Sequence, residues 1–90
     1  MSRFANQTVL VTGGTGGQGA SHVRALHAEG ANVVIGDINA ERGAGLAAEL
    51  GDGARFVRLD VSQEESWAAA IAETEKAFGA LSEVISTRSG

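Results

Sequence analysis

The sequence predicts an α/β fold in which a parallel sheet of three to four strands is flanked by helices. Short runs of β-branched and other apolar residues alternate with amphipathic segments of helical period. Parallel neighbours need a crossover connection, and each helical segment is long enough to supply one. If the crossovers are right-handed, the expected strand order is 3-2-1-4.

The first strand is expected at residues 8–12 and the first helix at residues 18–29. The strand is a short apolar run, whereas the helix places Val23 and Leu26 on its inward face. Gly30 follows as a C-cap, because glycine readily adopts the left-handed conformation that ends helices. These residues predict one strand and the helix that covers it.

The second strand is expected at residues 31–36, where asparagine, valine and isoleucine lead to Gly36. Asp37 follows it, and a helix with Leu46 and Leu50 four residues apart then runs to Gly51. Two internal glycines weaken this helix relative to alanine. The segment predicts a second strand and a second crossover helix.

The third strand is expected at residues 55–61 and the fourth at residues 83–86, followed by a polar tail. Between them, residues 62–65 (Ser-Gln-Glu-Glu) form a capping-box sequence, which predicts the start of a helix. Trp67, Ile71 and Phe78 share one face of that helix. We expect Trp67 to anchor the helix in the core or, at an exposed sheet face, to lie in a subunit contact.

Composition excludes several classes of function. The 90 residues carry a net charge of −4 and no cluster of Lys or Arg, which argues against nucleic acid as a partner. The chain has no cysteine, which excludes disulfides and thiolate metal sites and fits a reducing compartment, with the cytoplasm as the expected location. No apolar run approaches the roughly 20 residues that span a bilayer, and no signal peptide is evident.

The segment between the first strand and the first helix has the composition of a phosphate-binding loop. Residues 12–19 read Thr-Gly-Gly-Thr-Gly-Gly-Gln-Gly, with five glycines among the seven residues 13–19. Glycines at this point let the backbone approach a pyrophosphate, which the N-terminus of the helix also attracts. No Gly-Lys-Ser/Thr follows, so a P-loop is excluded. The loop therefore predicts a dinucleotide site in a Rossmann-type sheet.

Asp37 supports this interpretation and indicates which dinucleotide is bound. It lies eighteen residues after Gly19, close to the roughly 20 expected for an acid that binds the adenosine ribose. A carboxylate accepts hydrogen bonds from both ribose hydroxyls of NAD, but it repels the 2′-phosphate of NADP. NAD is therefore the expected cofactor. Arg42 is expected on the second helix as a solvated residue.

Four motifs resemble the N-terminal half of a classical short-chain dehydrogenase/reductase. They are the Thr12-Gly13-x-x-x-Gly17-x-Gly19 loop, Asp37, Leu59-Asp60-Val61 and Phe78-Gly79-x-Leu81, and they span residues 5 to about 81. The resemblance implies that Asp60 binds the adenine amino group and that Val61 contributes backbone contacts. The expected cofactor-binding residues are Gly13, Thr15, Gly16, Gly17, Gln18, Gly19, Asp37, Asp60 and Val61.

The sequence also departs from that family pattern. Gln18 stands where the family usually has an apolar residue, although this position contributes mainly its backbone N–H. After Leu81 the family continues with a strand that ends in Asn-Asn-Ala-Gly, which is absent here. Glu83 is expected inside a buried strand, at a cost of several kcal/mol if unpaired. We therefore divide the chain into a dinucleotide-binding half (1–81) and a divergent tail or partial fourth strand (82–90).

No catalytic or metal-binding residue is predicted. By resemblance, the catalytic Ser, Tyr and Lys of the family lie beyond this half; the chain has no tyrosine, and its only lysine, Lys76, is expected on a solvated helix face. His22 and His27 are five residues apart, about 140° around a helix, which is unsuitable for a shared metal.

Two functions of different classes remain open at this point. The chain is either the NAD-binding portion of an oxidoreductase, not catalytic by itself, or a non-catalytic nucleotide-binding or oligomerising module. A truncated sheet with one under-covered face and an open edge at its first or fourth strand predicts self-association into a homo-oligomer.

Overall fold

The computed structural model describes residues 7–13, 17–60, 62–79 and 81–86. Its elements, in chain order, are β1 (Thr8–Thr12), α1 (Gly17–Ala28), β2 (Asn32–Asp37), α2 (Ala40–Leu50), β3 (Ala54–Arg58), α3 (Glu64–Phe78) and β4 (Glu83–Ser86). All strand pairs are parallel, and the sheet has the order β3-β2-β1-β4. The predicted fold class and strand order are confirmed.

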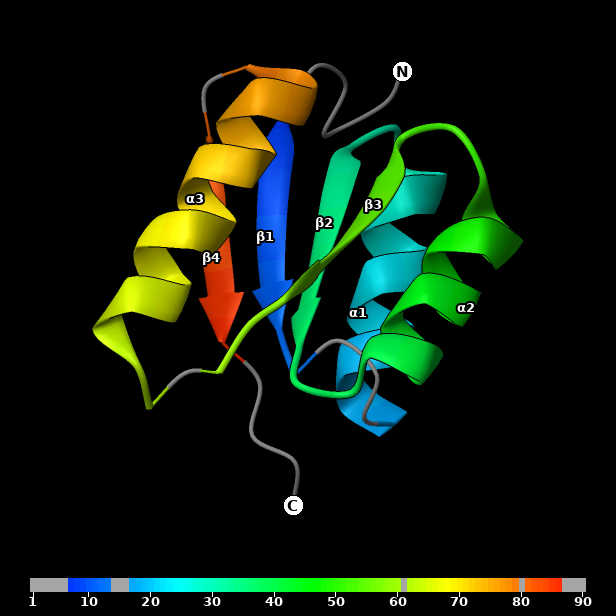
Figure 1. Ribbon diagram of the computed structural model, residues 1–90. Helices are drawn as coiled ribbons and strands as arrows, with labels where there is room; N and C mark the ends of the chain where they lie inside the picture. Colours follow the sequence, from blue (N-terminus) through cyan, green and yellow to red (C-terminus); the bar gives the residue numbers. More distant parts are fainter. Residues whose placement is uncertain (1–6, 14–16, 61, 80, 87–90) are drawn as a thin grey trace.

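Two layers of helices cover the sheet, with α1 and α2 on one face and α3 on the other (Figure 1). The face beneath α1 and α2 holds a hydrophobic core cluster, because apolar side chains of the two central strands meet those of both helices there. Its buried members are Val9, Val11, Val23, Leu26, Ala31, Val33, Ile35 and Leu46. The inward positions predicted for α1 and α2 are among them.

The helix α1 ends at a glycine, as expected. Gly30 has a φ of 91°, and its N–H donates to the carbonyl of His27 at 3.0 Å. The N–H of Ala31 reaches back to the carbonyl of Leu26 at 3.1 Å, so the carbonyls of Leu26 and His27 in the last turn of α1 have partners. This tight end allows β2 to start directly after the turn.

The predicted start of α3 is wrong in its detail. The helix begins at Glu64 with Gln63 as N-cap, and no side chain caps it. The N–H of Ser62 donates to the carboxylate of Asp60 at 3.0 Å, whereas in a capping box this N–H would donate to Glu65. The hydroxyl of Ser62 donates to the same carboxylate at 2.6 Å. Ser62 is therefore bound to Asp60 in the loop, and the helix begins one residue later than the capping-box sequence predicts.

The face of α3 that meets the sheet is centred on smaller residues than predicted. Ala70 and Thr74 are buried, whereas Trp67, Ile71 and Phe78 are half-buried beside them. A helix lying on a sheet approaches most closely where its side chains are small. The large apolar residues therefore flank the contact instead of forming its centre.

The strand β4 forms an edge of the sheet next to β1, and the other edge is β3. Glu83 pairs in register with Val9 and is exposed, so the expectation of a buried carboxylate at this position is wrong. The next residue, Val84, is 41% exposed. Because β1 is flanked by two strands, the open edge predicted at the first or the fourth strand lies at the fourth. The polar tail after residue 86 lies outside the described residues.

Candidate functional site

The candidate site lies at the carboxyl edge of the sheet, where all four strands end on the same side (Figure 1). Parallel strands bring the residues that follow them to one edge, and the register here aligns Thr12 with Gly36 and Asp37 with Arg58. Gly13 follows β1, Asp37 closes β2, and Asp60 comes two residues after β3. Three of the predicted site residues therefore lie along three adjacent strand ends.

Gly13 makes the turn out of β1. Its φ is 67°, in the left-handed region that side chains with a Cβ rarely adopt. Its N–H donates to the carbonyl of Gly36 at 2.8 Å, which extends the β1–β2 ladder by one residue. The chain leaves the sheet at this glycine and enters α1 at Gly17.

The remaining residues of the predicted loop are only partly described. Gly17, Gln18 and Gly19 form the first turn of α1, one residue earlier than expected for the helix start, and Gly19 is buried. Thr15 and Gly16 lie outside the described residues, as does Val61. The structure therefore places the helix N-terminus next to the end of β1, where a phosphate-binding loop requires it.

Asp37 is half-buried and its carboxylate is held by the chain that follows. Oδ1 accepts a hydrogen bond from the N–H of Asn39 at 2.9 Å. Asn39 in turn is the N-cap of α2, with its Oδ1 accepting from the N–H of Arg42 at 3.1 Å. The acid that ends β2 and the start of α2 are thus linked by two side-chain hydrogen bonds, which fix the orientation of the carboxylate.

Ile38, between Asp37 and Asn39, is 56% exposed although it is a large apolar residue. Sequence reasoning did not select it. The sequence could have indicated it, because this isoleucine comes directly after Asp37 and belongs neither to the apolar run of the second strand nor to the apolar face of the second helix. Single exposed apolar side chains are common on protein surfaces, so it is the position of Ile38 beside Asp37 that connects it with the candidate site.

Asp60 is held by the start of the α3 segment. Its carboxylate accepts two hydrogen bonds from Ser62, and its own N–H donates to the hydroxyl of Ser66 at 2.8 Å. The hydroxyl of Ser62, then its N–H, and to a smaller extent Arg58 hold the pKa of Asp60 below its usual 3.8, while partial desolvation opposes this. Asp60 is therefore a carboxylate at neutral pH, and it also holds the residue that begins the segment before α3.

The described groups at this edge are hydrogen-bond acceptors and backbone donors, without a nucleophile and base in contact. Lys76 is near the C-terminal end of α3. Because α3 runs antiparallel to the strands, Lys76 lies toward the amino ends of the strands, away from the candidate site. No group of three metal-ligating His, Asp or Glu side chains occurs among the described residues. No helix in that part of the chain is long and apolar enough to cross a membrane.

Fold and edge together define the class of protein as a Rossmann-type α/β unit, with its ligand edge at the carboxyl ends of β1, β2 and β3. More specifically, the chain belongs to the short chain dehydrogenase family, whose model matches residues 7–87. The match extends through β4, beyond Leu81, where the motif resemblance was expected to end.

Curated relatives agree with this assignment. The chain is 54% identical over 79 residues to a 3-alpha-(or 20-beta)-hydroxysteroid dehydrogenase of Mycobacterium tuberculosis, covering 88% of this chain and 30% of that protein. It is 44% identical over 89 residues to a 2,5-dichloro-2,5-cyclohexadiene-1,4-diol dehydrogenase of Sphingobium indicum, covering 96% of this chain and 36% of the relative. The chain thus spans about a third of the length of these relatives.

Solved structures show the same arrangement. The 3-hydroxyacyl-CoA dehydrogenase type-2 of Mycobacterium avium superposes with a TM-score of 0.89 at 41% identity, over 100% of this chain and 35% of that one. A 3-ketoacyl-(acyl-carrier-protein) reductase of Brucella melitensis, solved in complex with NADH, gives a TM-score of 0.86 at 30% identity over 89% of this chain and 33% of its own.

Proposed function

We propose that this chain is the NAD-binding portion of a short-chain dehydrogenase/reductase-like oxidoreductase and is not catalytic on its own. The observation that carries the proposal is the alignment of Gly13, Asp37 and Asp60 along one edge of the sheet. In the full-length family the reaction is hydride transfer between NAD(H) and an alcohol/ketone pair, and the bound dinucleotide supplies the hydride chemistry. The part assigned to this chain is to hold the adenosine and pyrophosphate.

Each predicted residue has a distinct role in this proposal. The loop and first turn of α1 bind the pyrophosphate through backbone N–H groups, which involves Gly13, Thr15, Gly16, Gly17, Gln18 and Gly19. Asp37 accepts hydrogen bonds from the ribose hydroxyls, and Asp60 with Val61 binds the adenine. Ile38 adds an exposed apolar surface beside Asp37, suited to one face of the adenine ring.

The proposal includes a preference for NAD over NADP. The N–H of Asn39 donates to Oδ1 of the Asp37 carboxylate, and in this proposal the carboxylate accepts hydrogen bonds from the ribose hydroxyls of NAD. A 2′-phosphate at the same place meets a negative charge instead, and like charges in close contact are unfavourable. Location in a reducing compartment such as the cytoplasm, proposed from the cysteine-free sequence, belongs to the same hypothesis.

We expect these 90 residues not to catalyse the reaction by themselves, because they do not include the catalytic residues of the family. The acid-base pair of the family is a tyrosine beside a lysine; the chain has no tyrosine, and Lys76 lies toward the other edge of the sheet. The division into a binding half (1–81) and a tail (82–90) stays part of the proposal. It is supported by the motifs before Leu81 and by the absence of the Asn-Asn-Ala-Gly sequence after it.

A titration calorimetry experiment tests the binding function. The chain is titrated with NAD and with NADP, and Asp37→Ala is compared with Asp52→Ala, which removes an exposed carboxylate at the turn before β3. Losing hydrogen bonds to a carboxylate costs about 1.5–3 kcal/mol, so Asp37→Ala is expected to weaken NAD binding roughly 10–100-fold. Asp52→Ala is expected to have no effect. A folded chain that gives no heat with either ligand refutes the proposal.

The second candidate function is that of an oligomerising module, favoured by the edge strand β4. This strand pairs with β1 on one side, and Val84 is 41% exposed on it. Open edges with apolar side chains pair readily with another strand. Light scattering over a range of concentrations is expected to show a homo-oligomer that Val84→Lys weakens; a monomeric mass at every concentration counts against it.

A further inference from the structure

The strand β3 is an edge of the sheet, and the part of the chain that the structure describes places no strand on its outer side. The carbonyl of Gly53 and the N–H of Leu59 both bond to β2, at 2.7 and 3.0 Å. Backbone groups of successive residues in a strand point to opposite sides, so the N–H and C=O of Phe56 and Arg58 face away from β2. These groups are a template for a further strand.

A groove lies between β3 and α3, on the face of the sheet opposite α1 and α2. In Figure 1, α3 crosses this face in front of β4 and β1, and β3 lies beside it. The groove has two adjoining parts of about 390 and 240 Å³, which share Phe56, Val57 and Glu73. Ala70 and Ala77 line it from α3. A strand added to β3 directs every second side chain toward this groove.

The sequence of β3 has a symmetric pattern of charge. It reads Arg55-Phe56-Val57-Arg58, with both arginines exposed and both apolar residues half-buried. The ring of Phe56 lies against Gly43 of α2, so Arg55 and Val57 point to the face that carries α3. Each face of the β3 edge therefore has one cationic and one apolar side chain.

Acids compensate the cations of the β3 edge only in part. Arg55 and Lys76 line the same part of the groove, and neither makes an ion pair or a side-chain hydrogen bond with any residue that the structure describes. Glu73 is the one acid among the described lining residues. Arg58 lies close enough to Asp60 to lower the pKa of that carboxyl, so Arg55 is the less compensated arginine. The β3 edge thus presents positive charge in a chain whose net charge is −4.

This pattern distinguishes among possible partner strands. A second copy paired through its own β3 would bring two arginines from each chain onto one short ladder, where like charges are unfavourable. Residues 1–6 and 87–90 carry one arginine each and no acid, so neither stretch is complementary. A segment in which two acids flank two apolar residues is complementary in either direction, because its order is symmetric.

We propose that the β3 edge and the groove beside α3 form a docking site for an extended acidic segment of another protein, which adds to the sheet as a further strand. The segment has the order acid-apolar-apolar-acid. Its backbone bonds to that of Phe56 and Arg58, its acids pair with Arg55 and Arg58, and one apolar side chain enters the groove beside Val57. Lys76 supplies a second cation for the acid on the α3 face. The site does not depend on the nucleotide site.

Fluorescence anisotropy with a labelled peptide tests the charge pattern. The probe reads Thr-Glu-Val-Val-Glu-Thr; one control peptide has lysine in place of both glutamates, and a second has the order Thr-Glu-Glu-Val-Val-Thr. The probe is expected to bind more tightly than either control, and to bind less tightly as salt is added. A probe that does not bind the folded chain, or a control that binds equally well, overturns the proposal.

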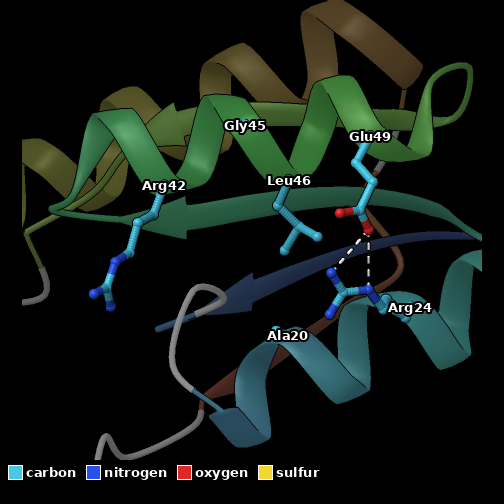
Figure 2. Close-up of a pocket in the computed structure, with 6 residues that line it drawn as sticks. All are labelled: Ala20, Arg24, Arg42, Gly45, Leu46 and Glu49. Carbon is cyan, nitrogen blue, oxygen red and sulfur yellow. Dashed lines mark hydrogen bonds and ion pairs between the residues drawn. The ribbon is translucent and has the colours of Figure 1, made fainter.

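A pair of arginine variants locates the binding. Arg55→Ser is expected to weaken the probe about two- to fivefold, because an exposed ion pair contributes little. Arg42→Ser is the matched control, since Arg42 is also exposed. Figure 2 shows it on α2, away from the Arg24–Glu49 ion pair of 2.8 Å. Circular dichroism checks that both variants fold. An equal loss in the two variants means that only net charge acts, which refutes the docking site.

Hydrogen exchange distinguishes strand addition from loose adhesion. The amides of Phe56 and Arg58 are expected to gain protection when the probe binds, whereas the amide of Leu59, already bonded to β2, changes little. Binding without this gain shows another mode of contact and overturns the proposal. If both amides are already protected in the concentrated chain alone and lose protection on dilution, a second copy occupies the β3 edge, which also overturns it.

Discussion

Replacing Gly43 with alanine is expected to destabilise the contact that holds α2 against β3. Gly43 is buried in α2, and a Cβ at this position overlaps the ring atoms Cδ1 and Cε1 of Phe56. Phe56 lies on β3 and packs against the core cluster, so its ring moves outward or α2 moves away from the sheet. Either movement disturbs the element that begins just after Asp37.

Two opposing effects set the magnitude. Alanine favours a helix interior over glycine by about 1 kcal/mol, whereas forcing extra volume into a packed site costs about 1–3 kcal/mol. Gly45 lies in the same helix, and a Cβ there meets nothing within 4 Å. Gly45→Ala is therefore expected to raise the free energy of unfolding by up to about 1 kcal/mol. The free energy of unfolding of Gly43→Ala is expected to be lower than that of Gly45→Ala by about 1–3 kcal/mol.

Thermal and urea unfolding followed by circular dichroism measure this difference. In a domain of this size, 1 kcal/mol corresponds to a shift in Tm of about 4–8 °C. The two substitutions share the gain in helix propensity, so their difference reports the contact with Phe56. Equal stabilities of Gly43→Ala and Gly45→Ala refute the reasoning, as does a difference that persists when Phe56 is replaced by alanine in both.

Three further predictions concern the sheet and α3. Gly36→Ala places a Cβ 2.8 Å from Cδ2 of Leu59, so thermal unfolding is expected to show a loss of about 1–3 kcal/mol that Leu59→Ala partly relieves. Hydrogen bonds from Ser62 lower the pKa of Asp60 below 3.8, so the Asp60 carboxylate stabilises the fold above that pH, and this stabilisation is lost as the pH falls through the lowered pKa. Asp60→Asn is therefore expected to show a smaller drop in Tm on acidification than the native chain. Equal pH profiles of Tm for the two proteins would contradict this. Among the residues that the structure describes, the hydroxyl of the buried Thr74 bonds only the carbonyl of Ala70, one turn earlier. Thr74→Val is therefore expected to be nearly neutral in thermal unfolding and Thr74→Ser to cost about 1 kcal/mol, and a large loss of stability in the valine variant would argue against this account.

Much of the fold could be predicted because each element carries its own local signal. The alternation of apolar runs and helical periods placed all seven elements within a few residues, and glycines ended α1 and α2 where expected. The position of Asp37 at the end of β2 followed from the length of its apolar run. These features depend on spacing along the chain, which a sequence shows directly.

Other features depend on which of several possible partners a side chain contacts, and the sequence does not show this. Ser62 had the pattern of a helix cap, but in the structure its N–H and its hydroxyl both donate to the carboxylate of Asp60, and Gln63 is the N-cap. Trp67 had the size of a core residue, but the centre of the helix–sheet contact goes to the small Ala70 and to Thr74. Arg42, by contrast, is exposed on α2, as the sequence predicted.

The backbone fixes the relative positions of the three site residues. Past the end of β1, the N–H of Gly13 donates to Gly36, and past the end of β3 the N–H of Leu59 donates to Asp37 at 3.0 Å. Each strand end is thus bonded to its neighbour through main-chain atoms that a side-chain substitution leaves in place. Removing the carboxylate of Asp37 or Asp60 leaves these main-chain bonds in place but removes the side-chain hydrogen bonds with Asn39 or Ser62. A loss of binding in these variants is therefore assigned to the ligand contact when circular dichroism shows that the variant keeps the fold and stability of the native chain.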